Sequence, residues 1–228
     1  MKWDQIIEYV GPHVVRIETP QGHGSGYLAL YNQDKTLVGI ATAALVVSHA
    51  DELDQPIKIH HVGSETPIHL AASERVVILD RKRDVALVVF PGNGHKLHEH
   101  PIVQRPADMP LATGDEVGWL GYPSMDAEAG LGYFSGTITA RLEQRNAYLI
   151  DGSPLESIVG GPVLFVADTG RFQIIGPVNH HKANETTDSA PPGLLVAQDI
   201  SHLHRLVENV RSMEEAWQKK TEFEKAGD

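Results

Sequence analysis

The 228-residue chain contains no cysteine, and this absence excludes several classes of protein. A scaffold held by disulfides is impossible, and so is a zinc site built on thiolates. A chain without cysteine is also typical of a reducing compartment. We therefore expect a cytoplasmic protein, with secretion left open.

Long apolar runs and positive charge are also scarce. No window of about 18 consecutive apolar residues occurs, so we expect no membrane-spanning helix. Residues Met1–Gln5 lack the basic-then-apolar layout of a signal peptide. The chain has 19 Lys and Arg against 30 Asp and Glu, a net charge of −11. Because such a surface repels phosphate backbones, we expect neither a membrane nor a nucleic acid as partner.

Short β segments separated by glycine and proline make up most of the chain. A short amphipathic helix over Met1–Val10 comes first and ends at Gly11-Pro12. The strands expected next are Val14–Ile17, Gly24–Leu30, Leu37–Ala41, Ile57–His61, Val76–Leu79 and Val85–Phe90. Strands at this spacing without long helices between them indicate an all-β sandwich or barrel.

A second set of β segments follows a proline-rich connector. Its members are Glu116–Gly121, Gly132–Leu142, Ala147–Ile150, Gly161–Val166, Phe172–Val178 and Leu194–Ala197. A final helix, capped by Asp199 or Ser201, has its apolar residues along one face. We expect a first β unit over 1–92, a linker over 93–110, a second β unit over 111–198, and a helix with its tail over 199–228.

Four segments in order resemble the trypsin-like serine proteases of the chymotrypsin fold, especially their cysteine-poor bacterial branch. Gly24–Leu28 resembles the G-S-G-F-L strand of the first barrel, and Ala41–Val47 resembles the T-A-A-H-V-V segment that delivers the catalytic histidine. Asp84–Leu87 resembles the segment of the triad aspartate, and Val159–Val163 resembles S-G-G-P-[VL] around the nucleophile. The resemblance implies two packed six-stranded antiparallel β-barrels closed by a C-terminal helix, with the triad positions in the cleft between them.

Two of the three triad positions carry residues that cannot perform the chemistry. The resemblance places Leu45 where the family has its general base and Val159 where it has its nucleophile, so that only Asp84 is retained. Leucine accepts no proton, and valine has no nucleophilic atom. Losing such a triad costs about a millionfold in rate. The sequence therefore predicts a protease-like fold without peptidase activity.

Neighbouring polar residues offer a poor replacement for the lost pair. His49 lies four residues after Leu45, about 6 Å along a helical turn, and Ser157 lies two residues before Val159. Triad geometry tolerates no such displacement without remodelling. Asp84, expected to lack an imidazole partner, is interpreted either as a structural hydrogen-bond acceptor for backbone N–H groups or the Thr42 hydroxyl, or as an inherited, partly solvated residue.

The peptide-binding parts of the pattern are better kept. The resemblance makes Asn179, His180 and His181 the open strand edge on which an extended peptide would add. It places Ser153 at the floor of the specificity pocket, where serine favours a neutral or apolar side chain, although nearby Asp151 could alter that preference. The oxyanion loop is expected at residues Ser157, Ile158 and Val159, and the lack of glycine at position 157 puts its formation in doubt.

The 13 histidines do not have the pattern of a metal site. Adjacent strand residues point to opposite faces, so His60-His61 and His180-His181 each supply at most one ligand to any site. We expect no metal and no cofactor. The leading hypothesis is a peptide- or protein-binding or regulatory module on a protease fold. The alternatives are a serine endopeptidase whose base and nucleophile were substituted in this chain, and a plain structural scaffold.

Overall fold

The computed structural model describes residues 3–92, 94–123, 130–152, 155–167, 169–179 and 193–226. The described chain is mostly β, with two antiparallel sheets and three α-helices. Helix α1 (Trp3–Val10) opens the chain and is followed by the 3-10 turn η1 (Gly11–His13). Its predicted end at Gly11-Pro12 is confirmed, since the proline supplies no amide for a further helical turn.

The first sheet has seven strands in the order β5-β4-β1-β2-β3-β7-β6. They are β1 (Val14–Thr19), β2 (Gly22–Tyr31), β3 (Leu37–Thr42), β4 (Ile57–His61), β5 (Ile68–Leu70), β6 (Val76–Asp80) and β7 (Val85–Pro91). Strand β5 is a three-residue partner of β4 that the sequence did not predict. The sheet is curled and open, with β5 and β6 at its edges, so this half has seven strands where six were expected.

The second sheet closes into a six-stranded barrel in the order β10-β13-β12-β11-β8-β9. Its strands are β8 (Glu116–Gly121), β9 (Gly132–Leu142), β10 (Ala147–Asp151), β11 (Pro162–Val166), β12 (Phe172–Asn179) and β13 (Leu194–Gln198). All six were predicted from their alternating or buried apolar patterns. The predicted all-β architecture of two packed β units is confirmed, with the second unit a complete barrel.

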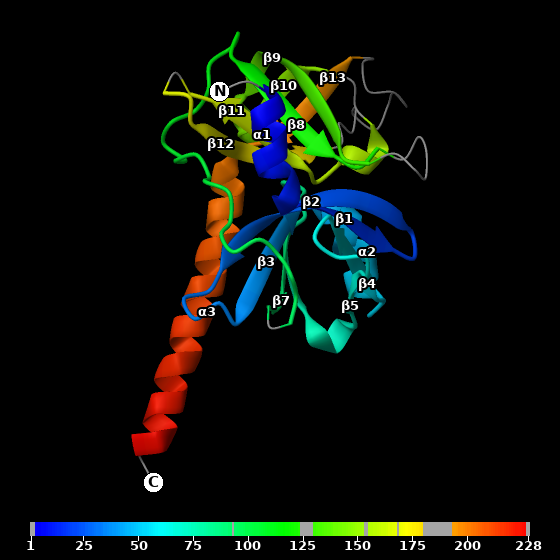
Figure 1. The fold of residues 1–228 in the computed structure, drawn as a ribbon. Helices are drawn as coiled ribbons and strands as arrows, with labels where there is room; N and C mark the ends of the chain where they lie inside the picture. Colours follow the sequence, from blue (N-terminus) through cyan, green and yellow to red (C-terminus); the bar gives the residue numbers. More distant parts are fainter. Residues whose placement is uncertain are drawn as a thin grey trace.

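Two helices complete the structure. Helix α2 (Ala44–Glu52) follows β3 directly, and its buried side packs into the first sheet's own core. Helix α3 (Ile200–Ala226) begins beside the barrel and runs alongside the first sheet, and its C-terminal end extends past the rest of the molecule (Figure 1). The four 3-10 turns include η2 (Ala72–Glu74), η3 (Glu143–Arg145) and η4 (Glu156–Ile158).

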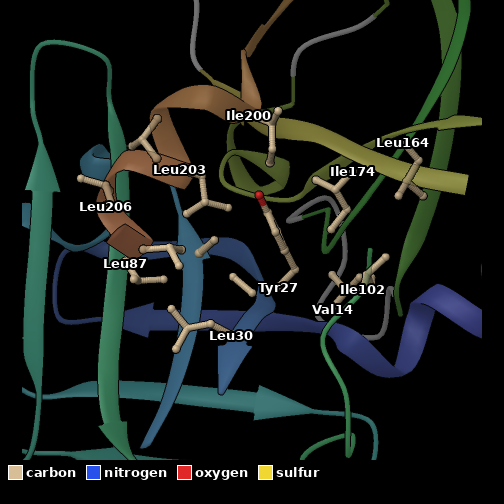
Figure 2. Close-up of a cluster of buried hydrophobic side chains, with 14 of the residues drawn as sticks. Val14, Tyr27, Leu30, Leu87, Ile102, Leu164, Ile174, Ile200, Leu203 and Leu206 are labelled. Carbon is tan, nitrogen blue, oxygen red and sulfur yellow. The ribbon is translucent and has the colours of Figure 1, made fainter. Parts of the chain in front are cut away.

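A shared apolar cluster holds the two sheets together. Figure 2 shows Tyr27 and Leu87 of the first sheet together with Leu164 and Ile174 of the barrel, with Leu203 of α3 among them. These side chains are almost fully removed from water. Burial of an aliphatic or aromatic side chain contributes about 1.5–3 kcal/mol. The cluster therefore fixes the two units against each other, and so fixes the loops that meet at their junction.

Candidate functional site

Leu45 and Asp84, which the sequence analysis predicts at triad positions, lie at the ends of two neighbouring strands. Leu45 is in the first turn of α2, directly after β3, and Asp84 ends the turn before β7. Strands β3 and β7 pair from Leu37↔Pro91 to Thr42↔Ala86, which brings these two ends together. The Leu45 backbone N–H donates to Asp84 Oδ1 at 2.7 Å. Two of the three predicted positions are therefore in direct contact.

Val159 reaches the same junction from the barrel. Its carbonyl oxygen accepts a hydrogen bond from the Ser25 backbone N–H at 2.8 Å. The next residue, Gly160, has a φ of 89°, and a Cβ there would overlap the Ser25 carbonyl oxygen and the Thr42 hydroxyl. Only glycine fits this close approach. The loop after η4 is thus held against the first sheet, a few residues from the start of α2.

The surroundings of Leu45 and Val159 differ. Leu45 is 53% exposed, while Val159 is 5% exposed. Neither side chain carries an atom that accepts a proton or attacks a carbonyl. Proton transfer and acyl-enzyme formation of the triad type have no agent at these two positions.

Asp84 has a structural role that the side chain at position 45 does not affect. Its carboxylate accepts the N–H of the second residue of α2, and a negative charge is favourable at a helix N-terminus. Its φ of 52° lies in the left-handed region, which aspartate tolerates better than most residues. The Thr42 hydroxyl, which we expected from the sequence as a possible partner of Asp84, instead donates to the Ser25 carbonyl oxygen at 2.7 Å. Of the two interpretations left open, this contact favours the structural acceptor.

Asn179, predicted at the open strand edge, supports the Asp84 turn. Its side chain is 2% exposed, and Nδ2 donates to the carbonyl oxygens of Arg83 and Asp84 at 3.3 and 3.4 Å. Asn179 also pairs with Val196 of β13. The residue as a whole is therefore engaged within the barrel, where β12 lies between β11 and β13, and Asn179 is not the open edge that the sequence predicted. His180, His181 and Ser153 lie outside the described residues.

The predicted oxyanion loop takes the form of a 3-10 turn. Ser157 and Ile158 are in η4, and the Ile158 N–H donates to the Leu155 carbonyl at 3.2 Å. Ser157 lies outside the left-handed region, so this turn forms without glycine's conformational freedom. The Ser25 hydroxyl donates to the Ser157 carbonyl oxygen at 2.9 Å. The same hydroxyl oxygen, Ser25 Oγ, accepts a hydrogen bond from the Tyr122 N–H at 2.9 Å.

The two residues considered as replacements are not equally accessible. Ser157 is 2% exposed, so its hydroxyl does not face solvent. His49 is in the last turn of α2 and is exposed. A buried hydroxyl requires a change of loop conformation before it can attack a substrate carbonyl. The geometry gives no support to a substitute triad of His49 and Ser157.

A pocket beside Leu45 and Asp84 contains basic residues that the sequence reading missed. Its volume is about 240 Å³, and its lining includes Ser48, Arg81, Lys82 and Arg145. Arg81 and Lys82 precede Asp84 in the turn before β7, while Arg145 comes from η3 in the barrel. The run Arg81-Lys82-Arg83-Asp84 was a usable signal, since three consecutive cations are unusual in a chain of charge −11.

Several of the described histidines make contacts at separate places in the fold. His60 Nε2 lies 3.1 Å from Glu18 Oε2. The His13 and His98 rings have centroids 3.9 Å apart, and burial followed by the neighbouring His98 lowers the pKa of His13 to about 4. Among the described residues, no three His, Asp or Glu side chains converge as metal ligands would. Within those same residues no helix is long and apolar enough to cross a bilayer.

Comparison with known proteins gives relatives by structure alone. No family model matches the chain, and no curated protein matches it in sequence. The inactive form of a mutant of Rv3671c from M. tuberculosis H37Rv matches with a TM-score of 0.63 at 17% identity, over 91% of this chain and 90% of that one. Deg5 matches with a TM-score of 0.64 at 20% identity, over 89% of this chain and 90% of that one.

A third similar structure is the serine protease of human pathogenic astrovirus. It matches with a TM-score of 0.54 at 16% identity, over 83% of this chain and 90% of that one. The described architecture of a curled sheet and a closed barrel, together with these matches, identifies the fold as that of trypsin-like serine proteases.

Proposed function

We propose that this protein is a trypsin-like serine-protease-fold module that binds an extended peptide or protein segment and has no peptidase activity. The observation that carries the proposal is that Leu45 and Val159, whose side chains have no proton-accepting or nucleophilic atom, lie at one junction held by main-chain hydrogen bonds. By the resemblance of the sequence, they stand where a trypsin-like protease has its base and nucleophile. On this proposal the chemistry is absent, and the framework around these positions serves to hold a peptide.

Peptide binding is supported by the shape and position of the pocket. It lies where the start of α2, the turn before β7 and the end of β12 meet, which is beside the triad-equivalent residues. Ligand sites occur preferentially at junctions between domains. An extended segment crossing this junction is the ligand that fits best.

The test measures activity and binding in the same preparation. The purified protein is treated with a fluorophosphonate probe and, separately, with casein, and is then screened against a random decapeptide library. We expect no covalent labelling, no cleavage, and saturable binding of a subset of peptides. The Ser157→Ala variant is the matched control. Labelling that disappears in this variant, or catalytic cleavage of casein by the unaltered chain, would refute the proposal.

The second candidate function is a serine endopeptidase silenced by substitution of its base and nucleophile. Retention of Asp84 against the start of α2 is the specific observation in its favour. The double variant Leu45→His with Val159→Ser restores both reacting groups. Peptidase activity in this variant, absent from either single variant, indicates an oxyanion hole and pocket that still function. Continued inactivity in a folded double variant indicates long-standing loss of activity.

A further inference from the structure

The basic pocket beside Leu45 and Asp84 draws its cations from both halves of the molecule. Arg81 and Lys82 are contributed by the first sheet, and Arg145 by the barrel. All three side chains are exposed. Because the two halves are fixed by a shared apolar cluster, these cations face the same space in the folded protein.

The charges in this pocket are not balanced by the groups around it. Arg81 pairs with Glu52 on α2 at 2.6 Å. Lys82 and Arg145 have no ion-pair partner in the part of the chain that the structure describes. Asp84 also lines the pocket, and its carboxylate keeps its negative charge while it accepts the Leu45 N–H. Lys82 and Arg145 outweigh this single carboxylate, so the pocket carries a net positive charge in a protein whose net charge is −11.

The size of the pocket indicates a single side chain as its occupant. Sites for whole small-molecule ligands enclose about 300–1,000 Å³. This pocket encloses about 240 Å³. Asn179 at the end of β12 is among its lining residues, so one side chain of a peptide that crosses this junction would reach it.

We propose that the pocket binds an acidic side chain, Glu or Asp, of the bound peptide, with Lys82 and Arg145 holding its carboxylate. This inference rests on the proposed peptide-binding function and names the class of peptide that it selects. The arginine offers two N–H groups in one plane, which match a carboxylate, while the lysine supplies a mobile point charge. The acidic surface elsewhere would repel such a peptide, so the pocket also fixes where it binds.

The experiment compares three pools of acetylated, amidated octapeptides. One position in each pool is restricted to Asp and Glu, to Ala and Leu, or to Lys and Arg, and the bound peptides are counted by mass spectrometry. We expect the acidic pool to be enriched about tenfold over the neutral one. This factor corresponds to the binding free energy that one charge-assisted hydrogen bond contributes. Raising the salt from 50 to 300 mM should reduce this enrichment, because exposed charges are screened.

Variants then test the named residues. Lys82→Glu with Arg145→Glu should abolish the acidic preference while the neutral pool still binds. The matched control is Lys35→Glu with Arg171→Glu, which makes the same change in charge at exposed loop positions outside the pocket lining. If the charge-reversed protein is poorly folded by circular dichroism, Lys82→Gln with Arg145→Gln replaces it.

The outcomes separate this inference from the function on which it rests. Equal enrichment of the three pools, or the same loss in the control as in the pocket variant, overturns the acidic preference and leaves peptide binding in place. Absence of binding by every pool overturns both. Competition by inorganic phosphate or N-acetylglutamate at concentrations equal to those of the best peptide identifies a site for free small anions, which also overturns the inference.

Discussion

Replacing Asp84 by alanine removes the carboxylate that caps α2 from another loop and places alanine in a left-handed backbone conformation. The lost contact is the 2.7 Å hydrogen bond from the Leu45 N–H to Asp84 Oδ1. Loss of an N-terminal cap costs about 1 kcal/mol. The φ of 52° adds about 1–2 kcal/mol for a residue with a Cβ and no polar side chain. We expect Asp84→Ala to lower the free energy of unfolding by about 2–3 kcal/mol.

Two further substitutions at this position separate the two contributions. Asp84→Asn keeps an oxygen for the Leu45 N–H and tolerates the left-handed conformation, so it should change stability by no more than about 0.5–1 kcal/mol. Asp84→Gly removes the cap but relieves the backbone, so it should be intermediate, with a loss of about 1–1.5 kcal/mol. The expected order of stability is wild type, Asn, Gly, Ala.

Urea unfolding followed by tryptophan fluorescence and circular dichroism measures these differences. Coincident transitions from the two probes establish that one free energy describes each variant. An Asp84→Ala variant as stable as the wild type would refute the capping role. A variant series in which Asn is as damaging as Ala would show that the negative charge, and not the acceptor geometry, carries the effect.

Three other substitutions test the packing of the junction and the pH dependence of stability. Gly160→Ala should cost at least about 3 kcal/mol or prevent soluble folding, because its Cβ overlaps backbone atoms, whereas Gly114→Ala, with a φ of 98° and open space around it, should cost only about 1 kcal/mol by urea unfolding. Ser25→Ala should cost about 2–3 kcal/mol, because it leaves the Ser157 carbonyl and the Tyr122 N–H without this hydrogen-bond partner, while the exposed Ser73→Ala control should change little in the same assay. Because burial and the neighbouring His98 lower the pKa of His13 to about 4, the unfolded chain binds this proton more readily, and stability should fall by about 2 kcal/mol as the pH drops from 6.5 to 4. His13→Asn should flatten that part of the pH profile in thermal unfolding, and an unchanged profile would contradict the assignment.

The alternating strands could be predicted from sequence because each buries one face or both. Strand β10, for example, alternates buried and more exposed residues from Tyr148 to Asp151, between two barrel neighbours. Strand β5 has only three residues, which is too short for a periodicity to be recognised. Helix α2 was not predicted because Val46 and Val47 continue the apolar run of β3, so the sequence shows no boundary between strand and helix.

The candidate site was predictable where a motif carries it and not where the fold assembles it. The resemblance brought Leu45 and Asp84 together, and the structure places them in hydrogen-bonding contact. The buried position of Asn179 could not be foreseen, because it depends on the turn that its side chain supports. Arg145 lies more than sixty residues from Lys82, and no local pattern connects them. Only the packing of the two sheets places both in one pocket.

The contact of Asp84 with α2 is compatible with both proposed functions. The hydrogen bond of Asp84 goes to a backbone N–H, which position 45 supplies whether the side chain is histidine or leucine. The contacts of Val159 and Gly160 with Ser25 are likewise made by the main chain. If Leu45 and Val159 stand at the base and nucleophile positions, as proposed, exchanging those two side chains would remove the chemistry without disturbing these main-chain contacts. The proposed binding function depends on this independence, because the junction is built from backbone groups that any side chain at positions 45 and 159 leaves in place.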